Sequence, residues 1–258
     1  MTAADFARLE QWFSQFTAGF ADLDPEGLRN IRLKEEHTRR VVACMAEIAA
    51  GEGLDAPQTL KALSIALLHD VGRFPQYRRW RTFRDSESDN HARLSVEVIR
   101  KERLLSFLSE EEQLEIEEAV RFHNLLELPQ RFASSSDRFT RLIRDADKLD
   151  IWWVFLEYYR QPQEERASAV GLGFPDLPEV TPACLDALAA GEVVRLEQAR
   201  VLNDFKLLQI SWVYDLNFST TRCLLRERAY LEQLAATLPD SSQVQAAVRR
   251  AVTSLEVV

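Results

Sequence analysis

The chain has only four histidines, and each lies in a segment with the pattern of a helix or a helix end. They are His37, His69, His91 and His123. Asp70 follows His69 directly, and neighbouring residues on a helix point about 100° apart, so both reach one ion only at a helix end or between helices. Imidazole and carboxylate ligands together suit divalent transition metals such as Mn, Fe, Co, Ni or Zn, whereas a Mg site is mostly oxygen and water. The set predicts a metal site that activates water.

A second acidic cluster lies later in the chain, in the run Asp145-Ala146-Asp147-Lys148-Leu149-Asp150. Residues three apart share a helix face, so Asp147 and Asp150 point the same way while Asp145 points elsewhere. Only part of the run can therefore face one ion. The spacing leaves open whether Asp147 or Asp145 is the last ligand.

The elements that must position these residues are helices. Apolar residues recur at helical spacing along most of the chain and strand-like alternation is scarce, which predicts an all-α fold. Asp55 with Pro57 opens a helix that runs towards His69, and Phe74-Pro75 breaks it. Ser109 and Glu112 form a capping box for a helix that reaches about His123.

Asp137 is the predicted N-cap of a long helix that carries the acidic cluster and stops before Pro162. A loop rich in Pro and Gly is expected from Gln161 to Pro182. Thr181-Pro182 then starts a short helix that ends at Gly191, and further amphipathic helices are expected over 192–238 and 242–257. We expect a core at 1–160 and a C-terminal helical extension at 161–258 in the same compact body.

The order of these residues resembles the HD superfamily of metal-dependent phosphohydrolases. Its signature is an early His, a His-Asp pair after an apolar helix, and a later Asp, which here look like His37, His69-Asp70 and Asp147. The flanking runs 67–74 (Leu-Leu-His-Asp-Val-Gly-Arg-Phe) and 146–150 (Ala-Asp-Lys-Leu-Asp) are also similar to the family's motifs. The resemblance covers roughly residues 37–150.

The resemblance implies an HD-domain helical bundle with one or two divalent ions (Mn, Fe, Co, Ni, Zn or Mg). The first ion would use His37, His69, Asp70 and Asp147. The second would share Asp70 as a bridge and add His91 and His123, which lie where two-metal branches of the family place second-ion ligands. A water or hydroxide between the ions would be the nucleophile, and Asp70 is thereby the central catalytic residue.

Phosphoryl transfer also needs cations around the equatorial oxygens. Five arginines lie between the His-Asp pair and His91, at positions 73, 78, 79, 81 and 84. We expect Arg73 and Lys148 to act in catalysis and substrate binding, and Arg78 and Arg81 to bind substrate. The alternative for Arg78 and Arg81 is a solvated helix face.

Two branches of the family fit less well. The cyclic-dinucleotide phosphodiesterases carry a lysine after the glycine and a Gly-Tyr-Pro motif, whereas Arg73 follows Gly72 here and that motif is absent. The acidic pair and synthetase domain of the stringent-alarmone hydrolases are not evident either. The resemblance therefore indicates a small phosphorylated substrate, with a nucleotide as the first expectation, and names no branch.

The composition of the chain narrows the possible binding partners and the cellular compartment. A formal charge of −9 argues against binding of long nucleic acid, which needs a broad basic face. Three distant cysteines, read as small buried hydrophobes, predict free thiols in a reducing compartment. With no basic leader and no apolar run of about 18 residues, we expect a cytoplasmic protein that does not enter membranes.

The sequence leaves homo-oligomer formation open. Two other functions stay open as well: a catalytically silent, nucleotide-binding regulatory HD module, and a di-iron oxygenase of the same fold.

Overall fold

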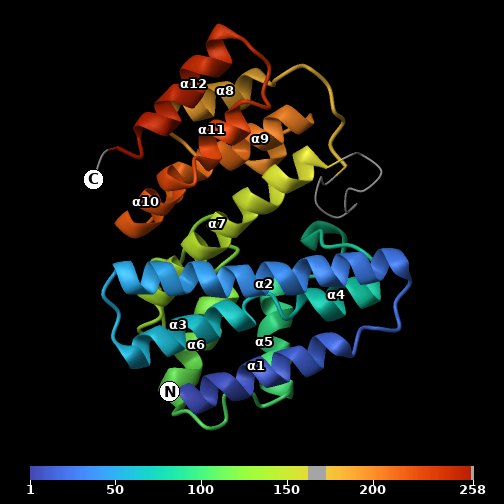
Figure 1. Cartoon of the computed structure of the whole chain (residues 1–258), viewed down its shortest axis with the longest axis vertical. Coiled ribbons are helices and arrows are strands. Elements are labelled where there is room, and N and C mark those ends of the chain that lie inside the picture. Colours follow the sequence, from blue (N-terminus) through green and yellow to red (C-terminus); the bar gives the residue numbers. More distant parts are fainter. Residues whose placement is uncertain (162–172, 257–258) are drawn as a thin grey trace. The chain divides into compact units, whose positions relative to one another are not determined.

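The computed structural model describes residues 1–161 and 173–256. These residues form α-helices and short 3₁₀ turns and contain no strand, which confirms the all-α fold. The chain divides into two compact units, Met1–Asp150 and Ile151–Val258 (Figure 1). That the core and the extension form one body stays a prediction. Within the described residues, no helix has the length and apolar character needed to cross a membrane.

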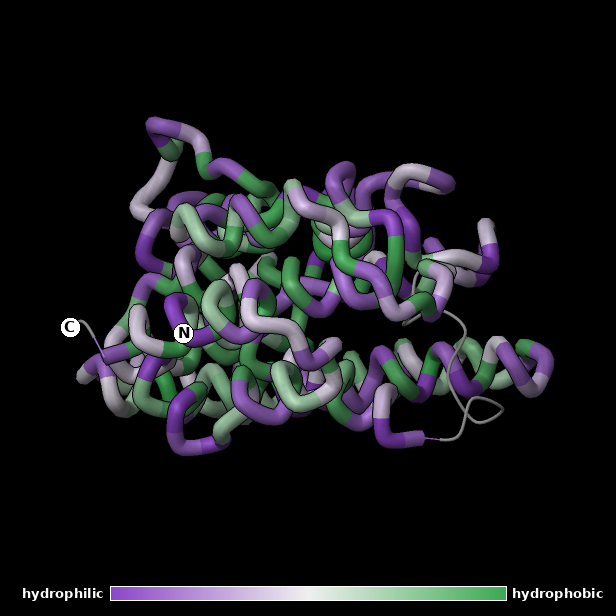
Figure 2. The backbone as a smooth tube through the Cα atoms, turned by 90° about the horizontal axis from the view of Figure 1, so that it is seen from above, coloured by the Kyte–Doolittle hydropathy of each residue, from purple (hydrophilic) through white to green (hydrophobic). Residues whose placement is uncertain are grey.

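The first unit contains six complete helices and the first half of a seventh. They are α1 (Ala3–Ala18), α2 (Pro25–Gly51), α3 (Ala56–Leu68), α4 (Arg73–Trp80), α5 (His91–Lys101), α6 (Glu110–Phe122) and α7 (Asp137–Arg160). A 3₁₀ turn, η1 (Asp85–Glu87), lies between α4 and α5. Along the tube in Figure 2, apolar and polar residues alternate within the helices, as expected for amphipathic helices that bury one face.

Local chemistry sets the ends of these helices. The Asp55 carboxylate accepts a hydrogen bond from the Gln58 backbone N–H at 2.8 Å and completes a capping box for α3. Ser109 and Glu112 form the predicted capping box of α6. The predicted break at Phe74-Pro75 was wrong, because α3 already ends at Leu68 and Pro75 lies in the first turn of α4, where a missing N–H costs nothing.

The core of this unit holds the metal-ligand candidates in place. α2 packs along α3, and α6 packs against both α3 and α5. Several large apolar side chains are fully buried between these helices, among them Met45, Ile48, Ile65, Leu68 and Ile116. Burial of each contributes about 1.5–3 kcal/mol relative to exposure, so the helices have little freedom to separate.

Gly72 explains how the end of α3 meets the start of α5. A Cβ at this position would lie 2.4 Å from the His91 carbonyl oxygen and 2.4 Å from the Ser95 backbone nitrogen. The Gly72 N–H also donates to Ser95 Oγ at 2.9 Å. Only glycine allows this close approach, which brings His69 and Asp70 next to His91.

The second unit contains the rest of α7, α8 (Pro182–Ala190), α9 (Leu202–Ser211), α10 (Ser219–Glu227), α11 (Tyr230–Ala235) and α12 (Ser242–Thr253). Gly191 ends α8 in the left-handed conformation, φ 83°, as predicted. The expected helical segment 192–238 is divided into three helices. The predicted loop at 161–182 lies partly outside the described residues.

The three cysteines are free thiols, as predicted. Cys44 and Cys184 are buried, but Cys223 is exposed, so its expected burial was wrong. Cys223 lies on the polar side of α10, whereas Thr221 and Leu225 are the residues of that helix that are buried.

Candidate metal centre

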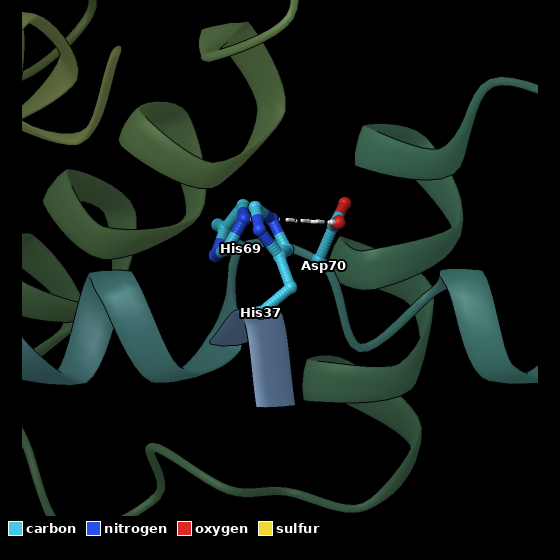
Figure 3. A group of neighbouring side chains, drawn as sticks. All are labelled: His37, His69 and Asp70. Carbon is cyan, nitrogen blue, oxygen red and sulfur yellow. Dashed lines mark ion pairs between the residues drawn. The ribbon is translucent and has the colours of Figure 1, made fainter. Parts of the chain in front are cut away.

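Six side chains from five helices converge inside the first unit. His37 comes from the middle of α2, His69 and Asp70 follow the end of α3, His91 begins α5, His123 follows α6, and Asp147 lies on α7. Their donor atoms form three overlapping groups, each with all atoms within 4.8 Å of one another. Figure 3 shows the group made by His37, His69 and Asp70, whose side chains point towards one another.

The first set of donors surrounds one face of Asp70. His37 Nε2 lies 3.2 Å from Asp147 Oδ1 and 3.6 Å from Asp70 Oδ2. His69 Nε2 lies 3.8 Å from each of the same two oxygens. Two ligands of one ion, each bound at about 2.1 Å, can lie at most about 4.2 Å apart. These four nitrogen–oxygen distances are therefore all within the limit for ligands of a shared ion.

The second set of donors faces the other oxygen of Asp70. His91 Nε2 lies 3.5 Å from Asp70 Oδ1 and 3.1 Å from His123 Nε2. Both distances are within the same limit. His123 also groups with His69 and Asp147, so it lies between the two sets. Asp70 presents one oxygen to each set, which is the geometry that a bridging carboxylate requires.

Two of the histidines are oriented by carboxylates behind them. His37 Nδ1 lies 2.6 Å from Asp150 Oδ2, and His91 Nδ1 lies 2.7 Å from Asp85 Oδ2. A carboxylate accepts hydrogen bonds, so each Nδ1 carries the hydrogen and donates it. The lone pair of each imidazole is then on Nε2, the atom that points into the cluster.

The other two histidines are oriented by backbone carbonyl groups of their own helices. His69 Nδ1 donates to the Ala66 oxygen at 2.7 Å, and His123 Nδ1 donates to the Val120 oxygen at 2.6 Å. Both residues directly follow a helix, where carbonyl groups three positions earlier have no partner within the helix. Thus each set contains one imidazole backed by a carboxylate and one backed by a carbonyl group.

Several of the inward-pointing atoms are buried without a hydrogen-bond partner. They are His37 Nε2, His69 Nε2, Asp70 Oδ1 and Asp147 Oδ1. Leaving such atoms unpaired costs about 1–3 kcal/mol each. In addition, the Nε2 lone pairs of His91 and His123 face each other at 3.1 Å, which is repulsive unless a cation lies between them. A divalent transition metal fits all these atoms, because it accepts electron pairs from nitrogen and oxygen.

The protonation of the site suits metal binding. Burial is the main cause that lowers the pKa of His91 and of His123 to about 4, with Arg73 contributing at His91 and His69 contributing at His123. Burial also lowers the pKa of His69. At neutral pH these imidazoles are therefore uncharged, which is the form that binds a metal.

The carboxylates stay ionised for a different reason. Burial alone would raise the pKa of Asp70, but the nearby charges of Lys34 and Arg73 oppose this, and the pKa is held well below its usual range. His37 is the exception among the histidines. Burial and the charge of Lys34 oppose its protonation, but the nearby carboxylates of Asp147 and Asp150 raise its pKa. A bound ion would replace that proton.

Two cations flank Asp70, and one of them was not predicted. Arg73 Nε lies 3.4 Å from Asp70 Oδ1, in agreement with a place for Arg73 at the site. Lys34 Nζ donates to Asp70 Oδ2 at 2.9 Å, and its side chain is 18% exposed. Both cations also lie within 6 Å of the centre of the Phe83 ring. The position of Lys34 one turn before His37 was the signal available in the sequence.

The other predicted substrate-binding arginines lie elsewhere. Arg78 donates to Asp22 and to the Gly19 oxygen, and Arg81 donates to Asp24. Their side chains are 42% and 40% exposed, in surface ion pairs with the α1–α2 segment. The structure does not bring them into the donor groups, and their substrate role stays a prediction.

The acidic cluster on α7 has separate tasks for its members. Asp147 is in the donor groups, whereas Asp145 is fully buried and is not among them, which favours Asp147 as the last ligand. Asp150 orients His37 from behind. Lys148, next to Asp147, is buried. Asp150 was expected on the helix face of Asp147, but its contact with His37 and that of Asp85 with His91 were not predicted from the sequence.

Comparison with known proteins identifies one match. Residues 35–152 match the family model of the HD domain. No curated protein and no solved structure matched the chain.

Proposed function

Since residues 35–152 match the HD domain, we propose that the protein is a metal-dependent phosphohydrolase. It cleaves a phosphomonoester or phosphodiester bond in a nucleotide or another small phosphorylated metabolite. One observation carries the proposal: four imidazole Nε2 atoms and the oxygens of Asp70 and Asp147 converge, and several of these buried atoms have no other partner. This donor set is suited to bind a metal cation, and the cationic side chains beside Asp70 are suited to bind a phosphate group.

Six residues would hold the metal: His37, His69, Asp70, His91, His123 and Asp147. One or two divalent ions bound there supply the activation of water and the neutralisation of phosphoryl charge. Asp70 stands between the two donor sets and turns one oxygen towards each. Its removal would disrupt both sets at once, which makes it the residue on which the site depends most.

Arg73 and Lys34 supply the positive charge that a phosphoryl group requires. Their side chains are 14% and 18% exposed, and both lie against Asp70. The guanidinium of Arg73 is always charged, and the ammonium of Lys34 acts as a point charge on the other oxygen of Asp70. We include Lys148 as a further cation, on the basis of its place beside Asp147.

The overall charge favours a small substrate. A formal charge of −9 opposes the approach of a long polyanion, whereas a single nucleotide needs only the local cations of the site. We also propose that the protein acts in the cytoplasm and outside membranes. Both proposals agree with the composition.

Two other functions would use the same donors. A silent regulatory module would bind metal and nucleotide without turnover, and a di-iron oxygenase would need iron specifically. The Arg73 and Lys34 pair beside Asp70 favours the hydrolase, because phosphoryl chemistry has a use for two adjacent cations.

The test combines metal analysis with an activity screen. Elemental analysis of the purified protein is expected to find one or two divalent ions per chain. A phosphate-release screen over nucleotides and sugar phosphates with Mn, Fe, Co, Ni, Zn and Mg is expected to show metal-dependent turnover. Bound metal without phosphate release would favour the regulatory module. Consumption of oxygen by the iron-loaded protein would favour the oxygenase. Absence of metal would contradict the whole interpretation.

Two variants sharpen the screen. Asp70→Ala is expected to lose bound metal and turnover together, while Asp186→Ala, on the exposed side of α8, serves as the matched control. Full activity in Asp70→Ala would rule out the site. Arg73→Ala is expected to keep its metal and lose turnover, and an unchanged rate would limit Arg73 to a structural role.

A further inference from the structure

Asp85 makes an unusual number of contacts for a residue in a short connecting segment. It begins η1, between α4 and α5, and each of its carboxylate oxygens has two partners. Oδ2 accepts from His91 Nδ1 at 2.7 Å and from Asn124 Nδ2 at 3.3 Å. Oδ1 accepts from Arg73 Nη1 at 3.1 Å and from Gln76 Nε2 at 3.0 Å. One side chain thereby joins α4, α5 and the end of α6.

We propose that Asp85 is the positioning residue of the second metal set, the one made by Asp70, His91 and His123. It fixes the imidazole of His91 with Nδ1 protonated and Nε2 free, and it holds Arg73 beside the same set. This assignment rests on the proposed two-metal function. Asp85 is a positioning residue because it contacts His91 on the side away from the other donors.

The contact with Asp85 fixes the orientation of the His91 ring. Rotation of the His91 ring would exchange the roles of its two nitrogens, and the carboxylate behind Nδ1 opposes this. With Nδ1 held at 2.7 Å from Asp85, Nε2 is 3.1 Å from His123 Nε2 and 3.5 Å from Asp70 Oδ1. Asp150 plays the same part for His37 in the first set. Each of the two donor sets thus has one carboxylate, Asp150 or Asp85, behind one of its histidines.

Arg73 contacts both Asp85 and Asp70. The Arg73 guanidinium donates to Asp85 Oδ1 and to the Phe83 carbonyl oxygen, while its Nε faces Asp70 Oδ1 at 3.4 Å. Asp70 Oδ1 is the oxygen that belongs to the second set. Asp85 therefore places a metal ligand and a substrate cation against the same carboxylate oxygen.

The test uses the variant Asp85→Asn in the full chain, titrated with Mn²⁺ alone in an isothermal calorimeter. The amide keeps the size of the carboxylate but can also present a donor to His91 Nδ1, which would favour the tautomer that cannot bind metal. The wild type is expected to bind two ions. In Asp85→Asn the first affinity is expected to stay unchanged and the second to fall about 10- to 100-fold. Glu87→Gln is the matched control, because Glu87 lies in the same segment and pairs with Arg84 at the surface.

Two unchanged affinities in folded Asp85→Asn would overturn the proposal, and so would a wild type that binds a single ion. If Asp85→Asn does not fold, imidazole ¹⁵N spectra of the Zn²⁺-loaded wild type decide instead. They are expected to show His91 protonated at Nδ1 and metal-bound at Nε2, and the reverse arrangement would contradict the proposal. Failure of the wild type to release phosphate from p-nitrophenyl phosphate or nucleotides, with two ions bound, would count against the phosphohydrolase alone.

Discussion

Asp150 offers a sharp test of how the first metal set is held together. Its side chain is 2% exposed and lies between His37 and Arg40. It accepts from His37 Nδ1 at 2.6 Å and from Arg40 Nε at 2.6 Å. The change Asp150→Asn keeps the shape of the side chain, but removes its charge and one of its two accepting oxygens.

Two effects of different size follow from these contacts. The amide oxygen can replace only one of the two close hydrogen bonds, and a hydrogen bond to a charged group contributes about 1.5–3 kcal/mol. Arg40 is 28% exposed and regains some solvation. We therefore expect the free energy of unfolding to fall by about 2 kcal/mol, or Tm by about 4–8 °C. Separately, loss of the orienting carboxylate is expected to weaken metal binding at His37 by about 10- to 100-fold.

The assay is a Mn²⁺ titration of the folded variant, together with thermal unfolding in the presence of a chelator. Chelation removes the contribution of metal to Tm, so the two effects are measured separately. Asp137→Asn is the control, because Asp137 lies on the same helix in an exposed pair with Arg141 and contributes about 0.3–0.5 kcal/mol. Wild-type affinity for both ions in folded Asp150→Asn would refute the idea that outer carboxylates prepare these histidines for metal.

Three further predictions concern residues around the site. Lys34→Met is expected to keep its metal while kcat/KM falls about 100-fold in a phosphate-release assay, because a cation beside Asp70 is lost. An unchanged kcat/KM would exclude a role of Lys34 in turnover. Arg78→Ala and Arg81→Ala are expected to change KM and stability little, since exposed ion pairs contribute about 0–1 kcal/mol, whereas a large rise in KM would support the predicted substrate role. Glu118→Gln is expected to lower the free energy of unfolding by about 1.5–3 kcal/mol at pH 7 in denaturant titrations. The difference from the wild type should shrink as the pH falls below about 4.5, because protonation of Glu118 removes the same interaction from the wild type. A difference that does not change with pH would contradict this.

The Glu118 prediction follows from a lowered pKa. Burial opposes ionisation of this carboxylate, but hydrogen bonds from Ser134, Ala133 and Ser136 outweigh burial and lower its pKa. A group with a lowered pKa in the folded state stabilises the fold above its unfolded pKa. That contribution is lost as the pH falls through the folded pKa. The relevant window therefore lies on the acid side of about pH 4.5.

Most of the helices, and a set of His and Asp side chains suited to a metal, could be predicted from the sequence. Periodicity and capping residues such as Asp55 and Ser109 are local signals, since a cap acts on backbone groups two or three residues away. The order of His37, His69-Asp70 and Asp147 was enough to indicate the HD domain. Gly72 could also be noticed in the sequence, but its reason, the close approach of α5, could not.

The tertiary structure alone decided which residues act together. Asp150 meets His37 across 113 positions of sequence, and Lys34 meets Asp70 across 36. It places Asp147, and not Asp145, in a donor group, puts the Asp85 carboxylate behind His91, and pairs Arg78 with Asp22. These contacts depend on how helices pack in three dimensions. Because a side chain's partner across a helix interface is set by the packing of the whole core, no local pattern in the sequence specifies it.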